Sequence, residues 1–292
     1  MKNLKTINEF WGAVIRRDMS SDVREEEKFH SVEELRDYLK KEIEKQGKNV
    51  VIKNLYLSNI DNLSYLFDGL LYNVETLDLS GWNTKGVNNM HSMFSGYNIK
   101  SLNLSGWNTE DVKDMSGMFF CCTHLKSLNL SGWNTSSVTD MSNMFNGCSQ
   151  IESLDLTGWD TRNVESMCLM FSECENLKSI VFPDWNTDSA IDMSHMFQNC
   201  KNLQSIDVSG WNTEKVIRMN YMFNGCYNLK SLDLSGWDVT NVEAMSYMFW
   251  NCVNLKSLDL SGWDTNNIKH NGSVFRNCPA PYKVVDNKIV RK

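Results

Sequence analysis

Hydrophobic and polar positions along most of the chain follow one short pattern that returns at a fixed interval. The segment Leu128–Cys148 shows it clearly and reads LNLSGWNTSSVTDMSNMFNGC. Leucines first alternate with polar residues, a period of two that predicts a short half-buried strand, and the Ser-Gly pair that follows predicts a turn. Val138, Met141, Met144 and Phe145 then recur at a spacing that suits one face of a short helix or 3₁₀ turn. One unit is therefore expected to form a strand, a turn and a helical return.

This unit is repeated along the chain, and a tryptophan marks each copy. The spacing between neighbouring tryptophans is 25 residues once and 26 residues six times. The tryptophans are Trp82, Trp107, Trp133, Trp159, Trp185, Trp211, Trp237 and Trp263. A degenerate unit precedes them, with Leu55–Ile60 in place of LxLSGW and Leu63–Phe67 in place of MSxMF. A period in this range is typical of leucine-rich repeats.

The predicted fold is therefore an α/β solenoid, a leucine-rich-repeat-like right-handed coil of about nine 26-residue units. We expect a parallel sheet on the concave side and short helices or 3₁₀ turns on the convex side. A single unit cannot stand alone, because its few apolar side chains do not offset the entropy of ordering 26 residues. Neighbouring units must supply the remaining contacts.

The repeated motif LSGWNT…MSxMFxGC resembles the BspA-like leucine-rich repeat family of bacterial proteins, in its tryptophan-containing subtype. The resemblance covers about residues 55–278. It implies a solenoid that binds other proteins, often at a bacterial surface and sometimes in adhesion to host matrix proteins, and it implies no catalytic residues. Surface members carry an export signal, and the N-terminus here lacks the pattern of a secretory signal. We therefore expect a cytoplasmic protein, with the cell surface or secretion by a non-classical route as the alternative.

Both ends of the chain depart from the repeat and are expected to cap it. Residues 1–48 contain two capping boxes, at Thr6–Glu9 and Ser31–Glu34, and predict a helical N-terminal cap. A docking module for another protein is the alternative for this segment. The solenoid is expected over residues 49–278. Residues 279–292 predict a C-terminal capping hairpin or tail around an Asp-Asn turn.

Charge and hydropathy narrow the classes of partner. The formal net charge is −7, and residues 55–278 carry 24 acidic against 13 basic side chains. An acidic body repels phosphate backbones, so we expect no nucleic-acid partner. No apolar run approaches the length of about 18 residues that a membrane-spanning helix needs, so we expect no membrane insertion.

The outward positions of the predicted strands form an acidic column on the concave side. The column consists of Asp78, Asn103, Asn129, Asp155, Val181, Asp207, Asp233 and Asp259. Neighbouring carboxylates should repel and raise one another's pKa. The column is compatible with a solvated stripe, a docking face for a basic partner or a cation site. Its candidate contact residues are Asp155, Val181, Asp207, Asp233 and Asp259.

Two irregularities in the repeat are candidate contact points. The sequence VFPD at residues 181–184 replaces the usual DLSG and either bends the solenoid or interrupts the acidic column at a contact. Tyr221, Tyr227, Tyr247 and Trp250 occupy positions that are small and polar in other units. Such an aromatic cluster on an acidic surface is typical of an interface hot spot. Local packing against the neighbouring unit is the alternative for these four residues.

The remaining columns indicate structure more than chemistry. Seven of the nine cysteines share one repeat position, and without an export signal we expect free thiols that serve packing, with disulfides or metal as lesser alternatives. The Asn or Asp after each tryptophan predicts an Asx turn. The five histidines share no repeat position, and no phosphate-binding glycine loop is present.

These observations lead to one functional hypothesis. We expect a non-enzymatic protein-binding solenoid of bacterial origin, without cofactor or metal, whose partner is another protein. The oligomeric state stays open, with a monomer favoured. Two alternatives stay open: a surface adhesin exported without a classical signal, and a purely structural repeat array.

Overall fold

The computed structural model describes residues 29–57, 59–183, 185–285 and 288–292. The helix predicted to open at Thr6 lies outside the described residues. The second predicted helix forms as α2, Val32–Gln46, whose N-terminus is capped by the Ser31 hydroxyl, an acceptor for the Glu34 amide at 3.1 Å. Gly47 ends the helix with a φ of 70°, and its amide donates to the Ile43 carbonyl.

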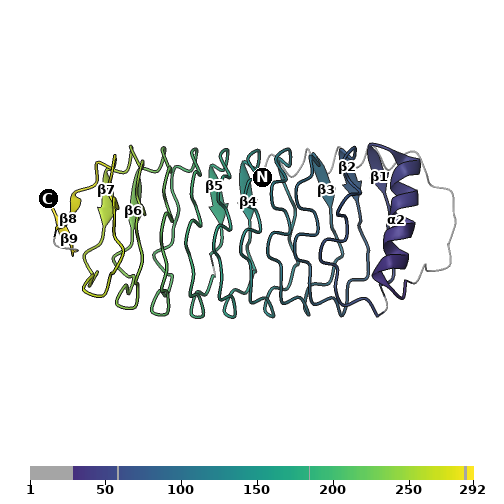
Figure 1. Cartoon of the computed structure of the whole chain (residues 1–292), viewed down its shortest axis with the longest axis horizontal. Coiled ribbons are helices and arrows are strands. Elements are labelled where there is room, and N and C mark those ends of the chain that lie inside the picture. The colour runs from purple at the N-terminus through teal and green to yellow at the C-terminus, as the bar shows by residue number, and fades with distance from the viewer. Residues whose placement is uncertain (1–28, 58, 184, 286–287) are drawn as a thin grey trace.

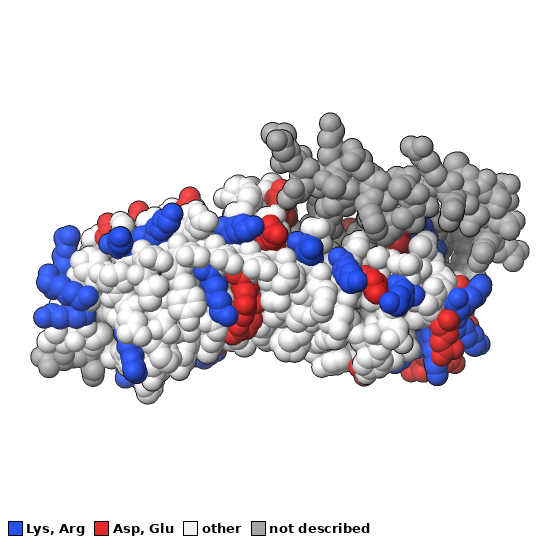
Figure 2. Space-filling view, turned by 90° about the horizontal axis from the view of Figure 1, so that it is seen from above, with Lys and Arg blue, Asp and Glu red and all other residues white. Residues whose placement is uncertain are grey.

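From α2 onward the chain winds into a parallel β-solenoid of stacked 26-residue coils, which Figure 1 shows as a nearly straight row. The strands that define one side are β1 Asn49–Val51, β2 Thr76–Asp78, β3 Ser101–Asn103, β4 Ser153–Asp155, β5 Ser179–Val181, β6 Ser231–Asp233 and β7 Ser257–Asp259. We call the outward surface of these strands the strand face and the opposite side of each coil the return face. The last coil is followed by an antiparallel hairpin of β8, Tyr282–Val285, and β9, Lys288–Arg291. Lys and Arg side chains gather at this end of the molecule (Figure 2).

The parallel sheet is interrupted, which the sequence pattern did not predict. The strands pair in register as β1-β2-β3, β4-β5 and β6-β7, so three separate sheets follow one another. The segments 127–129 and 205–207 carry the same pattern but form no strand. Leu128 and Ile206, their inward residues, are only partly buried, whereas Leu77 and Leu154 are almost fully buried. The strand ladder is therefore interrupted on the strand face at these two places.

The return face is built from successive turns, and within the described residues it contains no helix. The predicted short helices do not form, because every second amide hydrogen-bonds to the next coil. Gly117 and Phe119 donate to the carbonyls of Ser142 and Met144 at 2.8 and 2.9 Å, while Met118 donates back to Met115 in its own coil. This alternation requires a left-handed residue in each coil, such as Gly117 with a φ of 60°.

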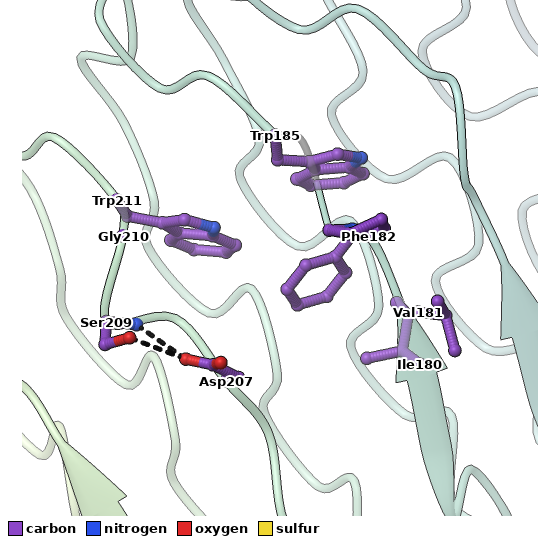
Figure 3. A pocket seen from close by; sticks show the side chains of 9 residues that line it. Ile180, Val181, Phe182, Trp185, Asp207, Ser209, Gly210 and Trp211 are labelled. Carbon is purple, nitrogen blue, oxygen red and sulfur yellow. Dashed lines mark hydrogen bonds between the residues drawn. The ribbon is translucent and has the colours of Figure 1, made fainter.

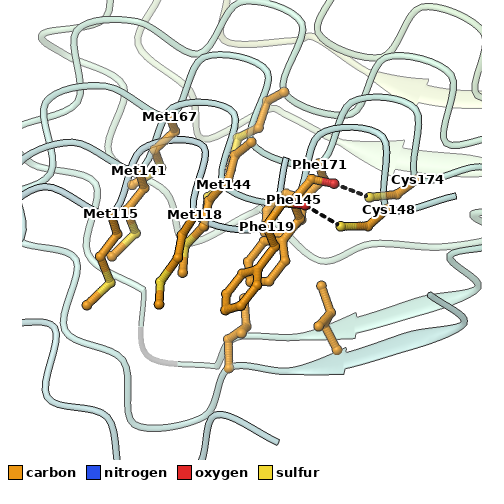
Figure 4. Close-up of a cluster of buried hydrophobic side chains, with 14 of the residues drawn as sticks. Met115, Met118, Phe119, Met141, Met144, Phe145, Cys148, Met167, Phe171 and Cys174 are labelled. Carbon is orange, nitrogen blue, oxygen red and sulfur yellow. Dashed lines mark hydrogen bonds between the residues drawn. The ribbon is translucent and has the colours of Figure 1, made fainter. Parts of the chain in front are cut away.

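The core consists of columns of identical side chains that run along the stack (Figure 4). Phe119, Phe145 and Phe171 stack with ring centroids 5.5 and 5.6 Å apart and are fully buried. Met115 and Met141 lie in a neighbouring buried column. Repetition thus gives each ring the same apolar contact above and below, so the packing between neighbouring coils is alike along the stack.

The cysteine column belongs to this packing. All nine cysteines lie within the described residues and are free thiols. The buried thiol of Cys148 donates to the Phe119 carbonyl at 3.1 Å, and the same bond links Cys226 to Phe197. Burial raises the pKa of Cys226 to about 12. The packing role predicted for this column is confirmed.

Candidate functional site

Exposed carboxylates at the ends of the strand segments form a stripe on the strand face. Asp207, Asp233 and Asp259 are exposed in three consecutive coils, and Asp155 lies two coils before Asp207. The Oδ1 atom of each accepts the amide hydrogen of the residue two positions on, at 2.9 to 3.1 Å. We call Asp207, Asp233 and Asp259 the acidic stripe.

The predicted mutual rise in pKa is wrong for Asp155, Asp207 and Asp233. Hydrogen bonds from the side chain and backbone of the following Thr157 or Ser209 hold the pKa of Asp155 and Asp207 below the ordinary value. The backbone and side chain of Ser235 do the same for Asp233. These local bonds outweigh the repulsion between coils, which water screens on an exposed face. Asp207 and Asp233 are therefore negatively charged at neutral pH.

Asp78, the remaining aspartate of the predicted column, is not part of the exposed stripe. It is buried, its Oδ2 lies 2.9 Å from the Lys53 amine, and its Oδ1 accepts from Asn103. Lys230 and Lys256 lie three residues before two of the stripe carboxylates, and within the described residues neither forms an ion pair. Uncompensated negative charge is thus concentrated in the C-terminal half of the strand face.

The sequence VFPD at residues 181–184 lacks both the donor and the acceptor of a turn that the other coils contain. In the other tryptophan-containing coils a Ser or Thr amide donates to the Asp or Asn two residues earlier, as Ser209 does to Asp207. Pro183 has no amide hydrogen, and Val181 has no acceptor in its side chain. Donor and acceptor are therefore lost together, and neither is left unsatisfied.

A hollow of about 420 Å³ opens at this irregularity (Figure 3). Phe182 takes the place of the usual leucine and lies between two indoles, with ring centroids 5.0 Å from Trp185 and 5.5 Å from Trp211. On one side the hollow is lined by Val181, whose side chain is 48% exposed, and on the other by Asp207. It coincides with the gap in the sheet between β5 and residues 205–207.

A second hollow, of about 350 Å³, continues from the first along the acidic stripe. It is lined by Asp207, Asp233 and Asp259 together with the serines that precede them in each coil. Asp207 borders both hollows. We call the two together the strand-face groove: an apolar, aromatic end at Phe182 leads into a line of three carboxylates.

Three of the four predicted aromatic residues come together on the return face. Tyr221 and Tyr247 stack with centroids 4.7 Å apart, and Trp250 lies 5.2 Å from Tyr247. His195 extends the stack at 4.6 Å from Tyr221, and the Arg276 guanidinium lies 5.6 Å from the centre of the Trp250 ring. Neighbouring rings thus cover one another's faces, as the packing alternative expects. A hot-spot role for this aromatic stack stays a prediction.

Tyr227 lies apart from the stack. No described aromatic ring contacts it, and its side chain is 37% exposed. Sequence reasoning did not single out His195 or Arg276. The signal was present for His195, because it occupies the same repeat position as Tyr221 and Tyr247.

Among the described residues, no three His, Cys, Asp or Glu side chains come close enough to hold a metal ion. None of the helices formed by the described residues has the length and apolar character to cross a bilayer.

The repeat matches one protein family three times along the chain. The model of that family, described as a Mycoplasma protein of unknown function, DUF285, matches residues 28–127, 97–205 and 178–287. The chain belongs to the DUF285 family. No curated protein matches the chain.

The three DUF285 matches have a structural counterpart. Each covers about four coils, and together they extend from just before α2 into the β8–β9 hairpin. The strand-face groove falls within the third match, and residues 181–205 also belong to the second. The groove is therefore built within the family's repeat array.

Proposed function

We propose that this DUF285 chain is a non-enzymatic protein-binding scaffold whose strand-face groove binds a basic, extended peptide segment with one large apolar side chain. The observation that carries the proposal is the continuity of the two hollows through Asp207. One offers an aromatic pocket and the other a line of carboxylates. The resemblance to BspA-like bacterial repeat proteins supports a binding role for the solenoid.

The apolar end of the groove has the size and lining of an anchor pocket. Its volume of about 420 Å³ accommodates one aromatic or long aliphatic side chain. Phe182, Trp185 and Trp211 would contact that side chain, and each is already held in place by its ring neighbours. A rigid pocket reduces the entropy lost on binding.

The acidic stripe has the charge and length to fix a short basic segment. Successive coils rise by roughly 4.8 Å, so Asp207 to Asp259 covers about 10 Å. An extended peptide spans that length in about three residues. The Oδ1 atom of each carboxylate is used within its own coil, so the Oδ2 atom is the oxygen available to a lysine or arginine.

The direct test uses a fluorescein-labelled peptide with one tryptophan followed by three lysines at alternate positions. Fluorescence anisotropy should show saturable binding that weakens strongly at about 1 M salt, where the Debye length is about 3 Å. A peptide with glutamates in place of the lysines should not bind. Replacing Asp207, Asp233 and Asp259 together by Asn should weaken binding by about tenfold or more.

The Asn variants leave the fold intact, because Asn103 and Asn129 already form the same turn in other coils. Asp155→Asn is the matched control: it lies beyond Val181, outside the groove, and should leave affinity unchanged. Equal losses in Asp155→Asn and in the triple variant would leave only non-specific attraction to the acidic body and would overturn the proposal.

The aromatic stack on the return face provides a second arm of the same experiment. Tyr247→Ala and Trp250→Ala remove two of its half-buried rings without touching the strand-face groove. If these variants abolish peptide binding while the triple Asn variant binds normally, the recognition surface is the return face and the groove proposal is wrong. Normal binding by both alanine variants supports the groove.

A further inference from the structure

One ladder of hydrogen bonds on the return face, which runs through the MSxMF segments, points the same way along the whole solenoid. In the seven coils from Met90 to Asn251, four amides spaced two residues apart donate to four carbonyls of the next coil toward the C-terminus. In the last complete pair the donors are Met245, Tyr247, Phe249 and Asn251, and the acceptors are His270, Gly272, Val274 and Arg276. The stack therefore exposes carbonyl oxygens at its N-terminal end and amide hydrogens at its C-terminal end.

The carbonyl end is closed by a cation. The Arg36 guanidinium, supplied by α2, donates to the carbonyls of Leu66 and Asp68 in the first coil, the latter at 2.7 Å, and also to Tyr65 at 3.0 Å. Leu66 and Asp68 occupy the positions whose carbonyls, from Met118 and Phe120 onward, accept amides of the preceding coil. Arg36 thus replaces the missing coil with positively charged donors.

The amide end has no corresponding anion in the described part of the chain. The amides of Ser273, Phe275 and Asn277 occupy the donor positions of the last coil, and no described acceptor hydrogen-bonds to any of them. Ser273 and Asn277 both have a φ of 56°, so left-handed residues recur among these three donors. Several backbone amides that point the same way can donate together to one anion.

Basic side chains surround these amides. A hollow of about 270 Å³ lies between the last coil and the β8–β9 hairpin and is lined by residues 273–276. Its remaining lining includes Lys283 and Lys292, and Arg276 supplies a third cation. None of the described residues that line this hollow is acidic, which contrasts with the strongly acidic body of the solenoid.

We propose that the C-terminal end of the solenoid is an oxyanion-binding site. The amides of Ser273 and Phe275 would donate to the oxygens of a phosphate, sulfate or carboxylate group, and Arg276, Lys283 and Lys292 would neutralise its charge. The bound oxygens would stand where the carbonyl oxygens of a further coil would lie. This site is independent of the strand-face groove, from which it differs in position and in sign of charge.

The test is a titration of the ¹⁵N-labelled, deuterated full chain, followed by the amide resonances. With sodium phosphate, the amides of Ser273, Phe275 and Asn277 should shift saturably, and those of Tyr247 and Asn251, which have partners, should not. Sodium chloride at equal ionic strength is the reference. Parallel titrations with acetate and with a glutamate-rich peptide distinguish the source: shifts with phosphate alone indicate a phosphate group, and shifts with all three indicate any oxyanion, carboxylates included.

Variants separate the site from general attraction to the basic hairpin. Lys283→Gln combined with Arg276→Gln should weaken phosphate binding by about tenfold. Lys288→Gln, on the same hairpin but outside the hollow, should leave binding unchanged. Absence of saturable shifts, shifts reproduced by chloride, or an equal effect of Lys288→Gln would each overturn the proposal.

Discussion

A buried threonine column offers a sharp test of how neighbouring coils are held together. In six coils the threonine two positions after the tryptophan donates its hydroxyl to a backbone carbonyl of the next coil, at 2.7 to 2.9 Å. The seventh coil has Val239 at this position, fully enclosed like the threonines. The Asp264 carbonyl, which would accept the bond, receives no donor from the described residues. Val239→Thr should therefore stabilise the protein.

The magnitude follows from two opposing terms. A hydroxyl bond to the Asp264 carbonyl, which receives no donor from the described residues, would contribute about 1–2 kcal/mol. Exchanging a buried methyl group for a hydroxyl gives up about 0.8 kcal/mol of apolar burial. The net expectation is a stabilisation of about 1 kcal/mol. Thr213→Val performs the reverse exchange one coil earlier and should destabilise by a similar amount, because it removes the 2.8 Å bond to the Asp238 carbonyl.

The assay is urea unfolding monitored by tryptophan fluorescence, together with amide hydrogen exchange in the two coils concerned. Exchange is needed because long repeat arrays do not always unfold in one step. A stabilising change should raise the urea midpoint without changing the slope and slow exchange around residues 239–265. If Val239→Thr lowers the midpoint as much as Thr213→Val does, the threonine bonds do not hold the coils together and the reasoning is refuted.

Three further predictions follow from named contacts. Arg36→Met removes three hydrogen bonds to carbonyls of the first coil and should destabilise that coil by about 2 kcal/mol. The loss should be seen as faster amide hydrogen exchange over residues 60–68. Lys40→Gln, at an exposed position of the same helix, is the neutral control. Salt bridges to Lys100 and Lys48 lower the pKa of Glu75 to about 2. The contribution of this carboxylate to stability is therefore complete above pH 4.5 and is lost as the pH falls through about 2. Glu75→Gln should make the urea midpoint less dependent on pH between these values, and an unchanged dependence would contradict the pairing. Native-state labelling with a thiol reagent should be slow at Cys168, whose pKa is raised to about 11, and absent at the buried Cys148 until the chain unfolds; rapid labelling of Cys148 would show that the column is open.

The solenoid and its core were predictable from the sequence because a repeated pattern constrains both. A 26-residue period with one tryptophan, one phenylalanine and two methionines per unit fixes which side chains lie above one another. The conformation of the return face was not predictable from apolar spacing, since positions three apart face inward in a helix and in alternating turns alike. A better signal for these turns lay two residues after the phenylalanine of MSxMF. Glycine or asparagine recurs there, at Gly96, Gly147, Asn199 and Asn251, all with positive φ, and these residues are the ones that favour the left-handed region.

The candidate groove was only partly predictable, because its hollow depends on the distance between coils. The VFPD motif marked the place, and the replacement of Leu by Phe182 was visible in the sequence. What the pattern could not show is that the sheet is interrupted after β5, so that Phe182 lines an opening between two coils. Strand pairing between identical short segments depends on small differences in packing that no repeat motif encodes.

The acidic stripe distinguishes what the fold requires from what it carries in addition. The turn after each strand needs only an acceptor oxygen two residues before its amide, and the asparagines at Asn103 and Asn129 supply it as well as an aspartate does. The negative charges of Asp207, Asp233 and Asp259 are therefore not needed to form the coils. The three carboxylates repel one another weakly, and the hydrogen bonds that lower the pKa of Asp207 and Asp233 outweigh this repulsion. Charge that the turn does not use, placed beside an apolar hollow, is the arrangement expected where the solenoid meets a basic partner.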